Sequence, residues 1–181
     1  LSVCTFWLEA GAPMRTYQMK THTTEVWTNA ALYFYAASAG SNGGFYQIDN
    51  VSMAYVPEQA ADRTDCVDPT TPAAPGGASG PNLLVNGDFN TGTLAPWFTF
   101  GTITTQITAG VLEFLKASIT TPAGVVAQPT GQTTTAGEIL TTTLQLGNSS
   151  GVRKRVTVIL HDSDFTDLAA CTFWLAPGQP L

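Results

Sequence analysis

The sequence Cys-Thr-Phe-Trp-Leu occupies residues 4–8, and the same five residues recur at 171–175. The segments that follow are also alike: Glu-Ala-Gly-Ala-Pro at 9–13 and Ala-Pro-Gly-Gln-Pro at 176–180. A five-residue identity that includes Cys, Phe and Trp is improbable by chance. The copies begin at residues 4 and 171, a spacing of 167 residues, which suits one domain plus a linker. We therefore predict a tandem repeat that the chain enters part-way and leaves at the same point of the next repeat.

Composition divides the chain into three parts. Residues 58–81 are rich in Pro, Ala, Gly, Thr and Ser with little to bury, which is typical of a linker. We predict that residues 1–57 are the C-terminal half of one β-sandwich repeat and that residues 82–181 are the N-terminal half of the next.

Residues 1–57 are too few to bury a sandwich core alone, so the two halves must meet. They can meet within one chain, as a permuted monomer, or by exchange between chains. In a permuted monomer the two Cys-Thr-Phe-Trp-Leu copies would compete for one strand position.

Short alternating segments predict an all-β fold. No segment sustains a helical period for three turns, and Gly, Pro, Asn and Asp separate short β-branched runs. This pattern favours a β-sandwich jelly roll. We expect strands at 4–8, 15–19, 30–37, 45–56, 98–107, 111–115, 123–128, 138–147 and 155–161, and a strand followed by a glycine turn at 82–90.

The charge composition limits the function classes. Charged residues make up 11% of the chain, against about 25% in average domains, and the net charge is −6. Nucleic-acid binding needs clustered Lys and Arg, so we expect no nucleic-acid partner. No apolar run approaches the roughly 20 residues of a membrane helix, so we expect no membrane segment. No nucleophile elbow, zinc-protease, phosphate-loop or dinucleotide motif is present, and the Glu residues are scattered. We therefore expect no enzyme.

Three cysteines, Cys4, Cys66 and Cys171, are an odd number for one secreted domain. In an intact repeat array, each repeat would carry two cysteines. Cys4 would then pair with Cys66, and Cys171 would pair with a neighbouring repeat or chain. An even count per repeat fits an extracellular or cell-surface location. The alternative interpretation is that the thiols are buried and unpaired.

Two further motifs carry a family resemblance. Asn-Leu-Leu-Val-Asn-Gly-Asp-Phe at 82–89, followed by Trp97, resembles the first strand of carbohydrate-binding modules of the family 4/9 type. Ile-Asp-Asn-Val-Ser-Met at 48–53 resembles their last strand. The wider sequence is similar to tandem repeats of large secreted bacterial proteins. The resemblance covers nearly all of the chain except the linker, but in swapped order.

The resemblance implies a jelly roll in which first and last strands lie near each other, and it implies no catalysis. Many family members hold a structural calcium ion at this place. Asp49 and Asp88 match the acidic positions of the two motifs, and Asn90 stands where the family usually has Glu. We therefore assign Asp49, Asp88 and Asn90 as the candidate calcium ligands.

Some family members bind glycans on aromatic side chains. Trp7, Tyr33, Tyr35 and Tyr46 alternate with core-like residues, so we expect them on the faces opposite the core, where rings can stack on sugars.

Two functions follow from these observations. The preferred one is a non-enzymatic extracellular structural or adhesive repeat that interlocks head-to-tail with copies of itself into a fibre, sheath or surface layer. The alternative is a polysaccharide-binding module attached to a larger secreted enzyme or adhesin.

Overall fold

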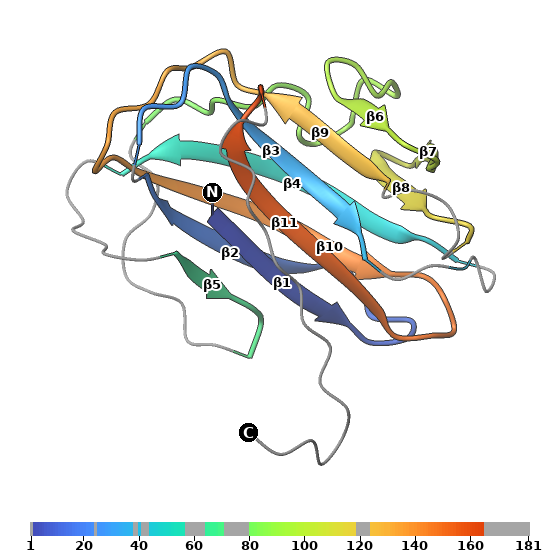
Figure 1. The fold of residues 1–181 in the computed structure, drawn as a ribbon. Helices are drawn as coiled ribbons and strands as arrows, with labels where there is room; N and C mark the ends of the chain where they lie inside the picture. The colour runs from blue at the N-terminus through green and yellow to red at the C-terminus, as the bar shows by residue number, and fades with distance from the viewer. Residues whose placement is uncertain are drawn as a thin grey trace.

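The computed structural model describes residues 2–23, 25–37, 40, 44–56, 64–70, 80–118 and 124–164. The second Cys-Thr-Phe-Trp-Leu copy and most of the expected linker lie outside these described residues. The described part forms two antiparallel sheets that face each other as a β-sandwich, which confirms the predicted all-β class (Figure 1).

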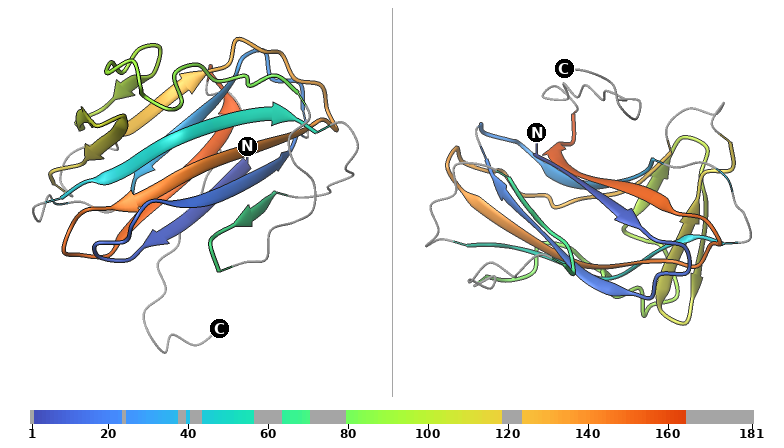
Figure 2. Two further views of the ribbon diagram at one scale, coloured as in Figure 1. Left: turned by 180° about the vertical axis from the view of Figure 1, so that it is seen from behind. Right: turned by 90° about the horizontal axis from the view of Figure 1, so that it is seen from below.

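Each sheet combines strands that are distant in sequence. The five-stranded sheet has the order β1-β11-β3-β9-β6, with bounds β1 (Ser2–Leu8), β11 (Lys154–Asp162), β3 (Ala30–Ala36), β9 (Val125–Pro129) and β6 (Phe98–Phe100). The six-stranded sheet has the order β5-β2-β10-β4-β8-β7, with bounds β5 (Asp65–Val67), β2 (Arg15–His22), β10 (Ile139–Asn148), β4 (Tyr46–Tyr55), β8 (Val111–Leu115) and β7 (Thr104–Thr108). Seen from behind, the six-stranded sheet covers the five-stranded one (Figure 2).

Strands from the two ends of the chain interleave. β3 lies between β11 and β9, and β10 lies between β2 and β4. Strands from residues 1–57 and strands after residue 82 therefore share both sheets within one chain, as a permuted monomer requires. The copy at residues 4–8 occupies the β1 position.

Strand β1 shows how side-chain alternation builds the core. Cys4, Phe6 and Leu8 are buried between the sheets, while Thr5 and Trp7 point outward. This period of two is the ordinary geometry of a strand with one buried face. Because the Cys4 side chain points into the space between the sheets, a partner on the opposite sheet can reach it.

The disulfide joins Cys4 to Cys66, which confirms the predicted pairing. The two Cα atoms lie 5.6 Å apart. Cys66 belongs to β5, the edge strand of the six-stranded sheet, and Cys4 belongs to the edge strand of the other. The bridge therefore closes one open side of the sandwich.

Strand β4 changes face in its middle. Thr143 of β10 pairs with Ser52 and Gln145 pairs with Asp49, so β4 contains one extra residue and forms a bulge. Asn50 takes a φ of 50° at this point. Met53 and Val51 point inward after the bulge, and strict alternation from them would turn Tyr46 outward. The extra residue reverses the faces, so that Ile48 and Tyr46 point inward instead. The prediction that Tyr46 lies opposite the core is wrong: its ring is fully buried and stacks on Phe114.

The segment at 82–90 forms turns, not the expected strand. It nevertheless runs beside β4: Leu83 N donates to Met53 O at 2.7 Å, and Val51 N donates to Gly87 O at 2.8 Å. The side-chain oxygen of Asn82 accepts a hydrogen bond from Met53 N. The two resemblance motifs therefore lie side by side, although only one of them is a strand.

The strand expected at 98–107 is two strands in different sheets. β6 ends at Phe100 and β7 begins at Thr104. Gly101 between them has a φ of 78°, which glycine adopts without a steric penalty. The chain crosses here from one sheet to the other, and a side-chain pattern cannot show such a crossing.

A buried carboxylate ties the end of β11 to the turn before β3. Asp162 accepts hydrogen bonds from Thr28 N at 2.7 Å, from the Thr28 hydroxyl and from Asn29 N. Burial acts to raise the pKa of Asp162, but these bonds and one from the backbone of Asp164 outweigh it, so its pKa lies below the usual range.

We predict that Asp162→Asn destabilises the protein by about 1–3 kcal/mol at neutral pH, because an amide cannot accept the same set of bonds. The folded pKa is lowered, so the ionised carboxylate stabilises the fold above the unfolded pKa of about 4. This contribution is lost as pH falls through the folded pKa. Urea unfolding should therefore show a deficit that shrinks in acid. Glu25→Gln, at an exposed acid before β3, is the control; a deficit independent of pH would contradict the assignment.

We predict that Gly87→Ala destabilises the fold by at least about 2 kcal/mol. A Cβ at this position would lie 1.9 Å from the backbone oxygen of Val51, which cannot move without disturbing β4. Gly151→Ala is the matched control, since a Cβ there meets nothing within 4 Å. Urea unfolding of both variants tests this expectation, and equal stabilities would contradict it.

Candidate functional site

Aromatic side chains gather on the outer face of the five-stranded sheet, the face that points away from the core. The strand registers place these outward side chains in two rows across all five strands. The first row contains Val3, Ile159, Tyr33, Ala127 and Phe98. The second row contains Thr5, Thr157, Tyr35, Val125 and Phe100.

The rows are buried at their centre and open at their ends. Tyr33 is 2% exposed, whereas Phe98 is 42% and Phe100 is 70% exposed. The Tyr33 ring stacks on His161 with ring centroids 4.2 Å apart and planes 10° apart. Buried residues of this face form a second hydrophobic cluster, separate from the main core, made of Ala31, Tyr33, Val125, Ala127 and Ile159. The exposed apolar surface therefore lies at the sheet edges.

Trp7 lies at the β1 edge of this face and is 46% exposed. The guanidinium carbon of Arg153 lies 4.3 Å from the Trp7 ring centroid, and that of Arg155 lies 5.8 Å away. Such contacts are favourable cation–π interactions. Arg153 also pairs with Glu9 at 2.7 Å. The arginine pair therefore holds the Trp7 ring against the sheet and covers part of its surface.

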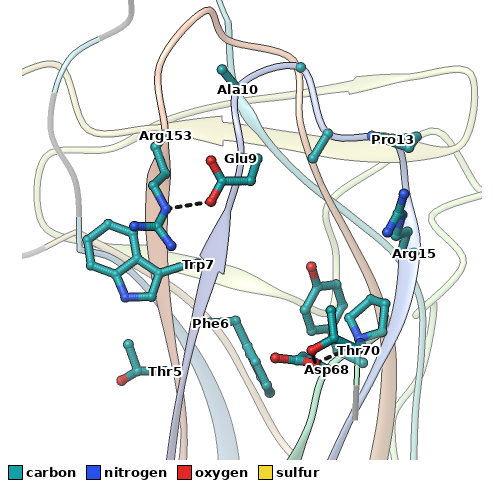
Figure 3. A pocket seen from close by; sticks show the side chains of 14 residues that line it. Thr5, Phe6, Trp7, Glu9, Ala10, Pro13, Arg15, Asp68, Thr70 and Arg153 are labelled. Atoms are coloured by element: carbon teal, nitrogen blue, oxygen red, sulfur yellow. Dashed lines mark hydrogen bonds and ion pairs between the residues drawn. The ribbon is translucent and has the colours of Figure 1, made fainter. Parts of the chain in front are cut away.

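A hollow of about 560 Å³ opens beside Trp7. Figure 3 shows Trp7, Glu9 and Arg153 on one side of it and Arg15 and Asp68 on the other. The hollow lies between the turn that joins β1 to β2 and the end of β5. It therefore forms on the side of the sandwich that the disulfide closes.

The carboxylates of this hollow are already hydrogen-bonded. One oxygen of Asp68 accepts from the backbone N and the hydroxyl of Thr70, at 2.8 and 2.6 Å. Burial raises the pKa of the nearby Tyr17, the Asp68 charge raises it further, and Arg15 opposes both. The lining of the hollow thus combines charged and aromatic side chains, so it offers both polar and apolar contacts.

The candidate calcium residues lie at the corner where 82–90 meets β4. Asp49 accepts bonds from the backbone and side-chain nitrogens of Asn50, at 2.7 and 2.9 Å. Asp88 accepts from the Asn90 side chain at 3.0 Å. Burial raises the pKa of Asp49, the Asn50 backbone bond opposes this, and the charge of Asp88 raises it further. The two acids are therefore close enough to interact.

Calcium takes about six to eight oxygen ligands. Within the described ranges, no group of three or more His, Cys, Asp or Glu side chains is placed to hold a metal ion. Two carboxylates would need several amide and backbone oxygens beside them. Calcium at Asp49, Asp88 and Asn90 therefore stays a prediction.

The structure separates the four predicted glycan-binding aromatics. Trp7, Tyr33 and Tyr35 share the outer face, and Tyr46 lies in the core. Phe98 and Phe100 are exposed as well, and the sequence patterns above did not identify them as surface residues. Their spacing around Thr99 was a signal, because it places both rings on one face of a short strand.

In the part of the chain that the structure describes, no helix has the length and hydropathy needed to span a membrane. No protein-family model matches the sequence, and no curated protein sequence matches it significantly.

Proposed function

We propose that this chain is a non-enzymatic extracellular structural or adhesive repeat that associates head-to-tail with copies of itself into a fibre, sheath or surface layer. One observation carries the proposal: each of the two edge strands of the five-stranded sheet has a strand neighbour within that sheet on one side only, and both expose apolar side chains. Among the described residues, β1 pairs only with β11 and β6 pairs only with β9. Unpaired edge strands are the usual places where one sheet extends into another.

The two edges differ, and they lie at opposite ends of one sheet (Figure 1). The β1 edge presents Trp7 and Val3, and the β6 edge presents Phe98 and Phe100, all on the outer face. A contact between unlike patches is heterologous, so it leaves the same two patches free on the ends of every oligomer. Such contacts produce a filament unless the rotation closes a ring.

The disulfide and the low charge support the extracellular part of the proposal. Disulfides persist in oxidising compartments outside the cytosol. The proposal includes the domain division predicted from the sequence: residues 1–57 and 82–181 are parts of consecutive jelly-roll repeats, and the linker at 58–81 joins them. On that interpretation the contact between edges forms between neighbouring repeats as well as between chains.

The alternative is a polysaccharide-binding module, and the position of Trp7 beside the hollow favours it. Other features oppose it. Sugar rings stack on open aromatic faces, but Arg153 lies over the Trp7 ring and Tyr33 is buried. The rings of Tyr33 and Tyr35 are tilted by 34° and so do not form one plane. These features favour the structural function.

We predict that the purified chain forms filaments, visible by negative-stain electron microscopy. Replacing Phe98 and Phe100 together by Ser should raise the concentration needed for assembly at least about tenfold. The contact buries both rings in the proposed assembly, and the double variant loses this burial of apolar surface. Val26→Ser is the matched control, since Val26 is exposed but lies outside both sheets.

Discrete monomers at all concentrations, or unchanged assembly of the double variant, would overturn the edge-to-edge proposal. Monomers that bind a polysaccharide, and lose this binding on Trp7→Ala, would establish the alternative.

A further inference from the structure

The two cysteines of the disulfide differ in their access to solvent. Cys4 is 1% exposed, because its side chain points between the sheets. Cys66 lies in the middle of β5 and is exposed. A thiolate breaks a disulfide by attacking one of its two sulfurs, and the rate depends on access to that sulfur. The Cys66 sulfur is therefore the one that a thiol from solution can reach.

The remaining attachment of β5 to the sandwich is short. Its ladder with β2 consists of the pairs Gln18 with Val67, Met19 with Cys66 and Lys20 with Asp65. Just before the strand, the Thr64 hydroxyl lies 2.9 Å from that of Ser2. None of the three β5 residues is fully buried, so the strand removes little apolar surface from water. The disulfide is therefore the main attachment of β5.

We propose that Cys66 is a site of modification by small thiols, and that thiol exchange at this sulfur releases β5 from the sandwich. This inference does not rest on the assembly proposed above, because it concerns one chain.

The exchange is balanced with the thiol as its only co-reactant. The attacking thiolate forms a new S–S bond with Cys66, and the Cys4–Cys66 bond breaks. Cys4 leaves as a thiolate and takes up the proton that the attacking thiol released. One disulfide and one thiol are present before and after the reaction, so no oxidant or reductant is consumed.

Release of β5 changes one side of the sandwich. β5 covers the backbone of β2 at residues 18–20, so its release leaves β2 as an open edge there. The chain directly after β5 supplies Asp68, Pro69 and Thr70 to the lining of the hollow. Figure 3 shows Asp68 and Thr70 across the hollow from Trp7. The modification therefore removes one wall of the hollow and leaves Trp7 on the other.

The rest of the sandwich keeps its own contacts. β1 pairs with β11 over its whole length, Ser2–Leu8, and β2 pairs with β10 over its whole length, Arg15–His22. The rings of Phe6 and Tyr17 pack edge to face between β1 and β2, with centroids 4.9 Å apart. The reduced Cys4 side chain can stay in the core, because a free cysteine behaves as a small apolar residue. We therefore expect a local opening.

The first test measures which sulfur is attacked. The full chain with Cys171→Ser, which leaves only the two bridged cysteines, is treated briefly with 2-mercaptoethanol, an uncharged thiol. The reaction is quenched in acid, free thiols are alkylated, and the adducts are mapped by peptide mass spectrometry. In the folded protein we expect at least about tenfold more adduct on Cys66 than on Cys4.

The same reaction in urea is the matched control. Both sulfurs are accessible in the unfolded chain, so the two adducts should agree within about threefold. Equal adducts in the folded protein, a preference for Cys4, or an adduct on neither cysteine would overturn the proposal.

The second test measures the release of β5 in the unmodified chain by hydrogen–deuterium exchange and mass spectrometry. Reduction with a phosphine breaks the same bond. It should make the backbone amides of residues 65–67 exchange at least about tenfold faster, because a released strand loses its ladder. Amides of residues 144–146, inside β10, should stay within about twofold. Unchanged exchange at residues 65–67 would overturn the release. Equal acceleration in β10 would show that the whole sandwich opens, and would overturn it as well.

Discussion

The disulfide between Cys4 and Cys66 is the constraint on which one side of the sandwich depends, because it holds the edge strands β1 and β5 together. It joins the edge strand of one sheet to the edge strand of the other across 62 residues of sequence. A closed loop of this size lowers the entropy of the unfolded chain by an amount equivalent to about 4 kcal/mol. β5 is only three residues long and pairs only with β2 among the described strands, so it depends on this bond more than on its own ladder. The hollow beside Trp7 exists because the bridge holds β5 there.

Interleaving of strands makes the rest of the fold cooperative. β10 lies between two strands from the N-terminal part of the chain, and β3 lies between two from the C-terminal part. Removing either part would expose an apolar sheet face and open ladders on both sides. Most of the contacts therefore join residues far apart in sequence, which implies slow folding relative to proteins with local contacts. Among the described strands, β1 and β6 are the edge strands of the five-stranded sheet, and the proposed assembly uses these two.

Local alternation in the sequence predicted most strand positions and the inward face of β1, and the cysteine count per repeat predicted the pairing of Cys4 with Cys66. It failed where one residue changes the geometry. The bulge at Asn50 reverses the faces of β4, so Tyr46 lies in the core. Gly101 separates one apparent strand into β6 and β7, and the turns at 82–90 depend on hydrogen bonds to Met53 and Val51. None of these features has a local signal, because each is set by a partner that is distant in sequence.

The identity of the two Cys-Thr-Phe-Trp-Leu copies extends further than core packing requires. A buried strand needs only Cys, Phe and Leu on its inward face, and a substitution of Thr or Trp on the outward face would leave that packing intact. Both outward residues are nevertheless repeated, and in β1 their contacts are with Thr157 and Arg155 of β11 and with Arg153 just before it. In β1, both faces of the motif therefore match one place in the fold, the edge of β11 that β1 occupies. On the repeat interpretation proposed above, each repeat would supply one such strand and one such edge, so the repeated motif would preserve this contact from one repeat to the next.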